Sequence, residues 1–354
     1  MVLAWWVALA LAQGVEPAFQ QAAQALARGD NATAERQLQF VLQRAPAHTG
    51  ALGNLGIVYA RTGRAPEAVA VYQRALKLAP DEPGLLLNLG LAQLQLENYA
   101  AAKTVLARIW RRGAPSAQVR ELLATAQLFT GEVDAALSTL EALNRADPAR
   151  SGVLYLLALG YLKKDDRASA GVAFENLLKV LSPAQAHYLA GKAYYETSSF
   201  EDAERELRLA GNAPLELGKT YLSLRRPDEA ARELRRALAS SPADVDAQYH
   251  LGALLVQDSA SEVEGEKLLA EVQRRRPDSW GAAYYLGKLR LTQKRPREAV
   301  ALLEAASRLH ADEPAVWFQL VQAYRMAGRA VEAKVAAERL ARLKQAANPP
   351  LVLK

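Results

Sequence analysis

Residues that could perform acid–base or metal chemistry are few and widely separated in this sequence. The four histidines are His48, His187, His250 and His310, and the nearest two are 60 residues apart. There is no cysteine, which excludes disulfides, cysteine nucleophiles and thiolate metal sites. The glycine patterns of phosphate-binding loops and the G-x-S-x-G of hydrolases are also missing from the sequence. We therefore predict no catalytic residue, no metal site and no cofactor, and a protein that is not an enzyme.

Tyrosines and basic residues form a second, larger group. The chain has 13 tyrosines, and its 44 Lys and Arg residues exceed its 38 Asp and Glu residues, for a net charge of +6. The two signs of charge are interleaved along the chain, whereas nucleic-acid binders usually gather basic residues in a patch. Basic runs such as 111–112, 235–236 and 274–276 lie near predicted helix ends, where we expect them to complement helix dipoles. This pattern favours an acidic partner or an anionic membrane surface over nucleic acid.

A repeat organises these residues. A small residue, here called the anchor, recurs mostly every 33–35 residues, at Ala22, Gly56, Gly90, Ala124, Ala158, Gly191, Gly218, Gly252, Gly287 and Val321. A second small residue follows each anchor by twelve or thirteen positions, and prolines such as Pro46, Pro80 and Pro148 recur at the ends of the repeats. Two series in one register indicate a tandem array.

The clearest copy, residues 52–80, shows what one repeat must be. Gly56 and Tyr59 share a face of one predicted helix, and Ala68 and Tyr72 share a face of a second. Gly63 lies between the two helices and supplies the turn. A single hairpin cannot bury its apolar face, whereas stacked hairpins can. The sequence therefore predicts an all-α array of about ten helical hairpins.

The pattern L-G-x-x-Y…A-x-x-x-Y-x-x-A…P of this copy resembles the tetratricopeptide repeat, whose period is 34 residues. The resemblance extends over about residues 15–347. It implies an α-α superhelix, a right-handed solenoid whose first helices line a concave groove and whose second helices face outward. It also implies a scaffold or adaptor for protein–protein interaction, which binds a segment of a partner protein or peptide in that groove.

Two steps depart from the period. The step from Gly191 to Gly218 is only 27 residues, so we predict a truncated hairpin near 205–217. Gly211 suits a helix end there and Pro214 suits a helix start. This deletion is either neutral or a functional hinge. One extra residue near 257–262 lengthens a turn within a hairpin.

The ends of the chain differ from the array. Residues 2–12 are all apolar and are too short to span a membrane, which takes about 20 residues. The sequence Ala10-Leu11-Ala12 fits a signal-peptidase site, although no basic residue precedes the apolar stretch. We predict a signal peptide at 1–12, a repeat array at 13–347, a disordered tail at 348–354 and no transmembrane span. The mature protein is then exported, periplasmic or secreted, and it is cytoplasmic if the signal does not function.

The resemblance places the groove beside the anchors of the first helices. Aromatic rings recur three residues before the anchors, and lysines recur one residue after them. The predicted partner-binding residues are Tyr155, Tyr188, Lys192, Tyr195, Lys219, Tyr249, Tyr284, Tyr285, Lys288, Phe318 and Arg325, together with Asn54 and Asn88. Such a lining favours an acidic, partly apolar segment of a partner. The alternative is that the rings pack between neighbouring repeats and that the lysines only solvate the groove.

The N-terminal half has leucines at the corresponding positions. They suit an amphipathic helix or self-association, or else they are ordinary core: Leu87, Leu91, Leu94, Leu122, Leu128, Phe129, Leu159 and Leu162. The last helix, from about residue 330 to 344, is expected to present a polar outer face. A second function is also open, in which the protein is an accessory for the assembly or export of an envelope polymer and its tyrosines stack on sugars.

Overall fold

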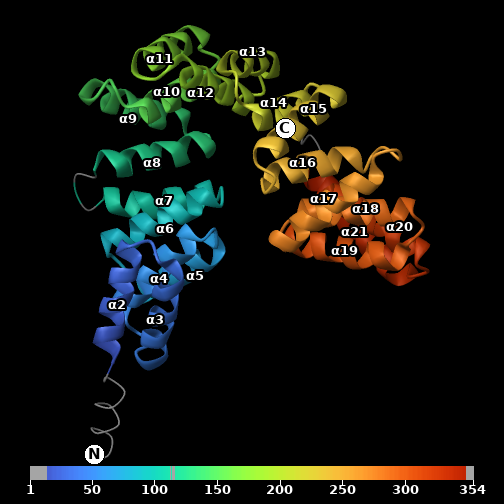
Figure 1. The fold of residues 1–354 in the computed structure, drawn as a ribbon, viewed down its shortest axis with the longest axis horizontal. Helices are drawn as coiled ribbons and strands as arrows, with labels where there is room; N and C mark the ends of the chain where they lie inside the picture. The colour runs from blue at the N-terminus through green and yellow to red at the C-terminus, as the bar shows by residue number, and fades with distance from the viewer. Residues whose placement is uncertain (1–13, 112, 114–115, 348–354) are drawn as a thin grey trace, which may run out of the picture. The chain divides into compact units, whose positions relative to one another are not determined.

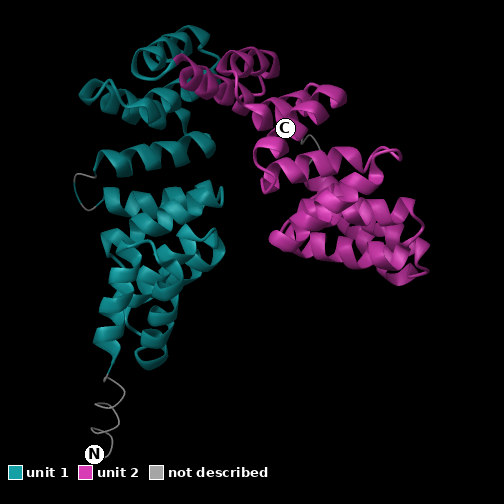
Figure 2. Cartoon of the chain, viewed as in Figure 1, with its two compact units in different colours: residues 1–182 teal, residues 183–354 magenta. Residues whose placement is uncertain are grey.

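The computed structural model describes residues 14–347 apart from 112, 114 and 115, and these residues form twenty α-helices and no strand (Figure 1). The helices alternate as first and second helices of ten hairpins, which confirms the predicted all-α array of stacked hairpins. Two compact units divide the chain, unit 1 at residues 1–182 and unit 2 at residues 183–354 (Figure 2). The predicted signal peptide and disordered tail lie outside the described residues and stay predictions.

Unit 1 contains five hairpins. Their helices are α2 (Val15–Ala27), α3 (Asn31–Arg44), α4 (Thr49–Arg61), α5 (Ala65–Leu78), α6 (Pro83–Gln95), α7 (Tyr99–Trp110), α8 (Ala117–Phe129), α9 (Val133–Ala146), α10 (Ser151–Lys163) and α11 (Arg167–Val180). Unit 2 contains the other five, in α12 (Pro183–Glu196), α13 (Phe200–Ala210), α14 (Pro214–Ser223), α15 (Pro227–Ser240), α16 (Val245–Leu255), α17 (Glu262–Arg275), α18 (Trp280–Thr292), α19 (Pro296–Leu309), α20 (Pro314–Met326) and α21 (Ala330–Ala347).

The anchors are small because the two helices of a hairpin meet there. A Cβ atom added to Gly56 would lie 2.4 Å from the ring of Tyr72, and one added to Gly218 would lie 2.6 Å from Cγ of Leu234. The alanine anchors, such as Ala158, are fully buried. Close packing of this kind tolerates no extra methyl group without movement of a neighbour. The anchor series in the sequence is therefore the seam of each hairpin.

The turn within each hairpin keeps one backbone conformation whatever residue occupies it. In nine hairpins the residue seven positions after the anchor has φ between 57° and 85°. Four of these residues are glycines, and the other five are Glu97, Asp165, Ser198, Arg225 and Lys294. Left-handed backbone is unfavourable for side-chain-bearing residues, so packing of the two helices sets the turn. The exception is the hairpin with the predicted insertion, where six residues separate α16 from α17.

The seven missing residues all come from one corner of the array. Helix α13 has 11 residues where its neighbours α11 and α15 have 14, and α14 has 10 where α10 and α18 have 13. The corner between α13 and α14 has three residues, whereas the other such corners of unit 2 have four. Gly211 ends α13 with φ 80° and Pro214 opens α14, at the positions that the sequence indicated. The hairpins on either side of the corner keep their seams.

Ion pairs and cation–π contacts link a second helix to the next hairpin at several places in both units. Arg226 bonds Glu204 of α13 at 2.7 Å, and its guanidinium lies 4.6 Å from the ring centroid of Tyr221. The same set of an arginine, a tyrosine and a glutamate occurs at Arg64 and at Arg329, each eight residues after its anchor. These contacts fix the stacking of consecutive hairpins on the side of the intra-hairpin turns.

Two predictions about the surface are corrected by the structure. The run 274–276 lies in the last turn and C-cap of α17 as expected, whereas 235–236 lie before the last turn of α15. Members of both runs also form ion pairs: Arg235 pairs with Glu264 at 2.9 Å, and Arg276 pairs with Asp246 at 2.7 Å. The last helix, α21, is not polar throughout its outer face, because Val331 is 75% exposed.

Candidate partner-binding surface

In unit 2 the predicted binding residues lie on the first helices α12, α14, α16, α18 and α20. The half-buried members are Tyr188, Lys192, Tyr195, Lys219, Tyr249, Tyr284, Tyr285 and Lys288, and the exposed members are Phe318 and Arg325. A half-buried ring has packed one part and left another part accessible, so the packing interpretation applies to part of each ring and the partner-binding interpretation stays a prediction.

The packed part of each ring contacts the next first helix. The hydroxyl of Tyr188 on α12 donates to a carboxylate oxygen of Glu216 on α14 at 2.8 Å. Tyr249 on α16 lies against Gly281 of α18, where an added Cβ would come within 2.5 Å of the tyrosine hydroxyl. In unit 1, Phe19 lies against Gly50 in the same way. Rings three residues before an anchor therefore help to stack neighbouring repeats. A glycine six residues before the following anchor was the sequence signal for this contact.

Two lysine–tyrosine pairs lie on α12 and α14. The ammonium of Lys192 lies 5.7 Å from the ring centroid of Tyr188, and the ammonium of Lys219 lies 5.1 Å from that of Tyr195. Both distances are within the range of cation–π attraction. We call these four residues the Lys–Tyr cluster. Its two cations sit on tyrosine faces that remain partly accessible, so it offers an anion and an apolar group adjacent places to bind.

A separate aromatic cluster lies on α16 and α18. The ring of Tyr285 is 6.2 Å from that of Tyr249 and 5.1 Å from that of Tyr284, and Trp280 lies 6.4 Å from Tyr284. Burial raises the pKa of Tyr249 to about 12. Burial, and then the charge of Lys219, lower the pKa of the adjacent His250 to about 4. This cluster is therefore uncharged at neutral pH. Trp280, which joins it, was missed because it lies outside the positions flanking the anchor.

The remaining predicted residues of unit 2 stand apart from both clusters. Lys288 and Arg325 form no hydrogen bond or ion pair with any side chain in the part of the chain that the structure describes. Phe318 is 48% exposed. The structure thus brings together seven of the predicted residues of unit 2 in two clusters and leaves these three outside them.

In unit 1 the predicted apolar groove is narrower than expected. Leu128, Leu159 and Leu162 are buried core residues, so their assignment to a groove was wrong. A first helix in the middle of a stack packs on its own second helix and on both neighbouring hairpins, which buries more than one face. The partly accessible residues are Leu87, Leu91, Leu94, Leu122 and Phe129, together with half-buried Asn54, Asn88 and Tyr155.

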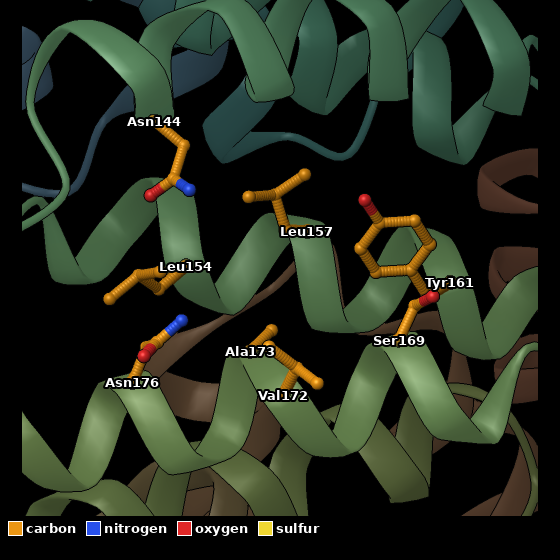
Figure 3. A pocket seen from close by; sticks show the side chains of 8 residues that line it. All are labelled: Asn144, Leu154, Leu157, Tyr161, Ser169, Val172, Ala173 and Asn176. Carbon is orange, nitrogen blue, oxygen red and sulfur yellow. The ribbon is translucent and has the colours of Figure 1, made fainter.

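A small recess lies among α9, α10 and α11 of unit 1, away from the predicted groove residues (Figure 3). We call it the unit 1 recess; its volume is about 190 Å³. It is lined by Asn144, Leu154, Leu157, Tyr161, Ser169, Val172, Ala173 and Asn176, none of which is charged. Figure 3 shows these side chains converging from the three helices.

Metal and membrane chemistry find no support in the described residues. No group of three or more His, Asp or Glu side chains within residues 14–347, as far as they are described, is arranged to hold a metal ion. Among the described helices, none combines the length and the apolar character needed to cross a bilayer.

Comparisons with known proteins agree with the repeat architecture. Two family models, both described as tetratricopeptide repeat, match the chain, one at residues 19–83, 215–279 and 284–349 and the other at residues 62–126. The "Cellulose synthase 2 operon protein C" of Komagataeibacter xylinus is 26% identical over 91% of this chain. The chain spans only 30% of the length of that relative.

Solved structures of helical-repeat proteins are also similar. MamA (residues 41 to the end) from Desulfovibrio magneticus RS-1 is 21% identical, with a TM-score of 0.46 over 48% of this chain and 96% of that one. The P58(IPK) TPR domain is 17% identical, with a TM-score of 0.31 over 89% of this chain and 98% of that one.

Proposed function

The chain belongs to the tetratricopeptide repeat family, and on that premise we propose that it is a non-catalytic scaffold that binds an acidic, partly apolar segment of a partner protein along the first helices of unit 2. The observation that carries this proposal is the Lys–Tyr cluster. Each of its lysines lies over a tyrosine ring that is only half-buried. An acidic side chain can bind the ammonium groups while an adjacent apolar side chain packs on the rings.

The neighbouring groups support the same partner chemistry. Lys288, one residue after its anchor on α18, has no ion-pair partner in the described part of the chain and is available to a third acidic group. The aromatic cluster between these lysines carries no charge at neutral pH, since His250 has a pKa of about 4. Cationic and apolar places therefore alternate on this surface, and a partner segment in which acidic and apolar side chains alternate fits it best.

Charge reversal tests this proposal. We would replace Lys192, Lys219 and Lys288 together by Glu and compare protein capture from envelope extracts with that of the native chain. The matched control replaces Lys267, Lys294 and Lys334, which are exposed and lie elsewhere in unit 2, so its net charge is the same. We expect capture of a specific acidic partner to fall about tenfold or more in the first variant only. Equal capture by both variants would sink the proposal.

A second function has support from the relative named for a cellulose synthase operon. In this function the protein is an accessory for the assembly or export of a polymer, and the aromatic cluster of Tyr249, Tyr284, Tyr285 and Trp280 contacts sugar rings. Half-buried aromatic rings are suitable platforms for apolar faces of a ligand. Titration with cello-oligosaccharides, followed by tryptophan fluorescence, separates the two. Saturable quenching that is lost in Trp280→Ala, without protein capture, favours the polymer function.

A further inference from the structure

A second recess of the molecule lies in unit 2, between a first helix and the second helices on either side of it, and none of the residues proposed above lines it. Helices α13, α14 and α15 enclose a volume of about 560 Å³, which we call the unit 2 recess. Four arginines line it: Arg208, Arg226, Arg232 and Arg236. Two glutamates, Glu229 and Glu233, also line it, so arginines outnumber acids two to one. Its volume is within the usual range for ligand sites, about 300–1,000 Å³.

The unit 2 recess occupies the same place in its repeat as the unit 1 recess. Leu217 and Tyr221 stand one residue before and three residues after their anchor, as do Leu157 and Tyr161. Arg232 and Arg236, fourteen and eighteen residues after the anchor, replace the uncharged Val172 and Asn176 of the earlier repeat. Glu229 and Glu233 likewise replace Ser169 and Ala173. A stripe that is uncharged in one repeat thus carries two arginines and two glutamates in the other, and Arg208 and Arg226 add the positive excess.

The seven-residue deletion leaves one end of the unit 2 recess open. In unit 1 the corner of the recess is filled by Asn144, a residue of helix α9. The equivalent residue in unit 2 is Gly211, which ends the shortened α13 and has no heavy atom within 4 Å of where a Cβ would be. Loss of the last turn of α13 has therefore removed side chains that would otherwise occupy this space.

The arginines differ in how firmly they are held. Arg226 bonds both Glu204 and Glu229, at 2.7 and 2.9 Å, and has a structural part to play. Arg236 pairs only with Glu233 on its own helix and is 54% exposed. Arg232 has no hydrogen-bond or ion-pair partner in the described chain. Arg232, and the exposed side of the Arg236 guanidinium, can therefore reach a bound anion without breaking a contact between helices.

We propose that the unit 2 recess binds a carboxylate-bearing peptide segment, in which acidic side chains flank an apolar one. Two arginine forks match carboxylates in geometry as well as in charge. Buried Leu217 and Tyr221 form an apolar floor between them. Tyr221 is 7% exposed, and the Arg226 guanidinium covers its ring. No aromatic face is thus open to stack on a sugar, which favours a peptide over an acidic polysaccharide.

The proposal is tested with a fluorescein-labelled peptide of alternating Glu and Leu residues, measured by fluorescence anisotropy with the full chain. The first variant carries Arg232→Gln and Arg236→Gln, which removes two charges and leaves a shorter polar side chain at each position. The control carries Arg235→Gln and Arg297→Gln, two exposed arginines of second helices that do not line the recess. We expect the first variant to bind about tenfold or more weakly and the control to stay within about twofold of the native chain.

Three outcomes overturn the proposal. They are equal loss in both variants, equal binding of a peptide with Gln in place of Glu, and tighter binding of oligogalacturonate than of the peptide. The Lys192, Lys219 and Lys288 variant distinguishes the recess from the proposed function. If that variant loses the peptide and the arginine variant keeps it, the peptide binds the first helices and the recess proposal fails alone. Unchanged thermal unfolding of the arginine variant shows that a loss of binding is not a loss of fold.

Discussion

The unit 1 recess and the unit 2 recess begin from the same hairpin geometry and end as different surfaces. Both are framed by a leucine and a tyrosine of the first helix and by one stripe of the following second helix. In unit 1 the equivalent positions line two recesses that share Tyr161, one of about 190 Å³ without charge and one of about 300 Å³ in which Glu141 and Asp166 stand where unit 2 has Arg208 and Arg226. The unit 2 recess holds about 560 Å³, four arginines and two glutamates. The difference arises outside the seams that hold the helices together.

Seams on both sides of the deletion are nearly identical. A Cβ added to Gly191 would lie 2.6 Å from Leu207, and one added to Gly218 would lie 2.6 Å from Leu234. In a quasi-one-dimensional array each hairpin contacts only its neighbours, so a corner can lose two helical turns while the packing within each hairpin is kept. The comparison indicates that corners of such an array can change shape and charge at little cost to the core.

The largest effect is expected from a substitution at the anchor, where the two helices of a hairpin pack against each other. Gly218→Ala adds a methyl group 2.6 Å from Leu234 and should destabilise unit 2 by about 1–3 kcal/mol. Faster hydrogen exchange in α14 and α15 measures this change. The control is Ala158→Gly at the same position of unit 1, which should cost about 1 kcal/mol. Unchanged hydrogen exchange in the Gly218→Ala variant would show that the seam at Gly218 can accept a methyl group and is not tightly packed.

Acid should weaken a carboxylate contact beside each of the two recesses. A hydrogen bond from Arg226 lowers the pKa of Glu229 in unit 2, and hydrogen bonds from Ser169 lower the pKa of Asp166 in unit 1. A carboxyl whose pKa is lower in the folded state stabilises the fold above its unfolded value, and this contribution is lost as pH falls through the folded pKa. Both contributions are therefore present at pH 7 and fade below about pH 4.5.

Glu229→Gln isolates the contribution of unit 2. We expect it to lower the melting temperature by about 1–2 °C at pH 7 and by less as the pH falls and the native carboxyl becomes protonated. Asp166→Asn is the matching change in unit 1. Melting curves across this pH range provide the measurement. A gap between native and Glu229→Gln protein that widens on acidification contradicts the assigned tie.

The sequence was sufficient for the fold because the features that define it are local. The small residues at Gly56 and Gly218 mark contacts between helices joined by a short turn, and their spacing alone reveals the repeat. The turn was predicted from a glycine, Gly63, but Asp165 and Arg225 adopt the same left-handed backbone conformation at the equivalent positions. Tertiary packing of the two helices there outweighs the preference of the individual residue.

The binding surfaces were less predictable because they depend on pairs of repeats. Whether Tyr249 is exposed depends on Gly281 of the next repeat, and the arginines of the unit 2 recess come from the second helices of two successive hairpins and from the residue before α15. Leu159 was assigned to a groove because of its position beside the anchor, but packing on neighbouring hairpins buries it completely. Comparing equivalent positions of successive repeats, such as Val172 with Arg232, was the available signal for the recess.

Filling the unit 2 recess should reduce its difference from unit 1. Gly211→Asn copies Asn144 at a position where φ is 80°, a conformation that Asn tolerates better than most residues. We expect binding of the Glu–Leu peptide to weaken by about threefold, equivalent to less than about 1 kcal/mol. Gly29→Asn is the control, because that glycine has φ 77° and the same open surroundings in a unit 1 turn. Equal binding by both variants would show that Gly211 does not shape the site.

The smallest effect tests whether the turns beside the two recesses have the same backbone. Asp165 and Arg225 each stand seven residues after their anchor, with φ of 58° and 57°. Glycine removes the steric cost of left-handed backbone but also increases the freedom of the unfolded chain. Each substitution by Gly should therefore stabilise its unit by about 0.5 kcal/mol, measured by urea unfolding. Gly63→Ala reverses the change and should destabilise. If Arg225→Gly stabilises and Asp165→Gly does not, the strain at the two turns is unequal, and the deletion has altered more of its hairpin than the corner.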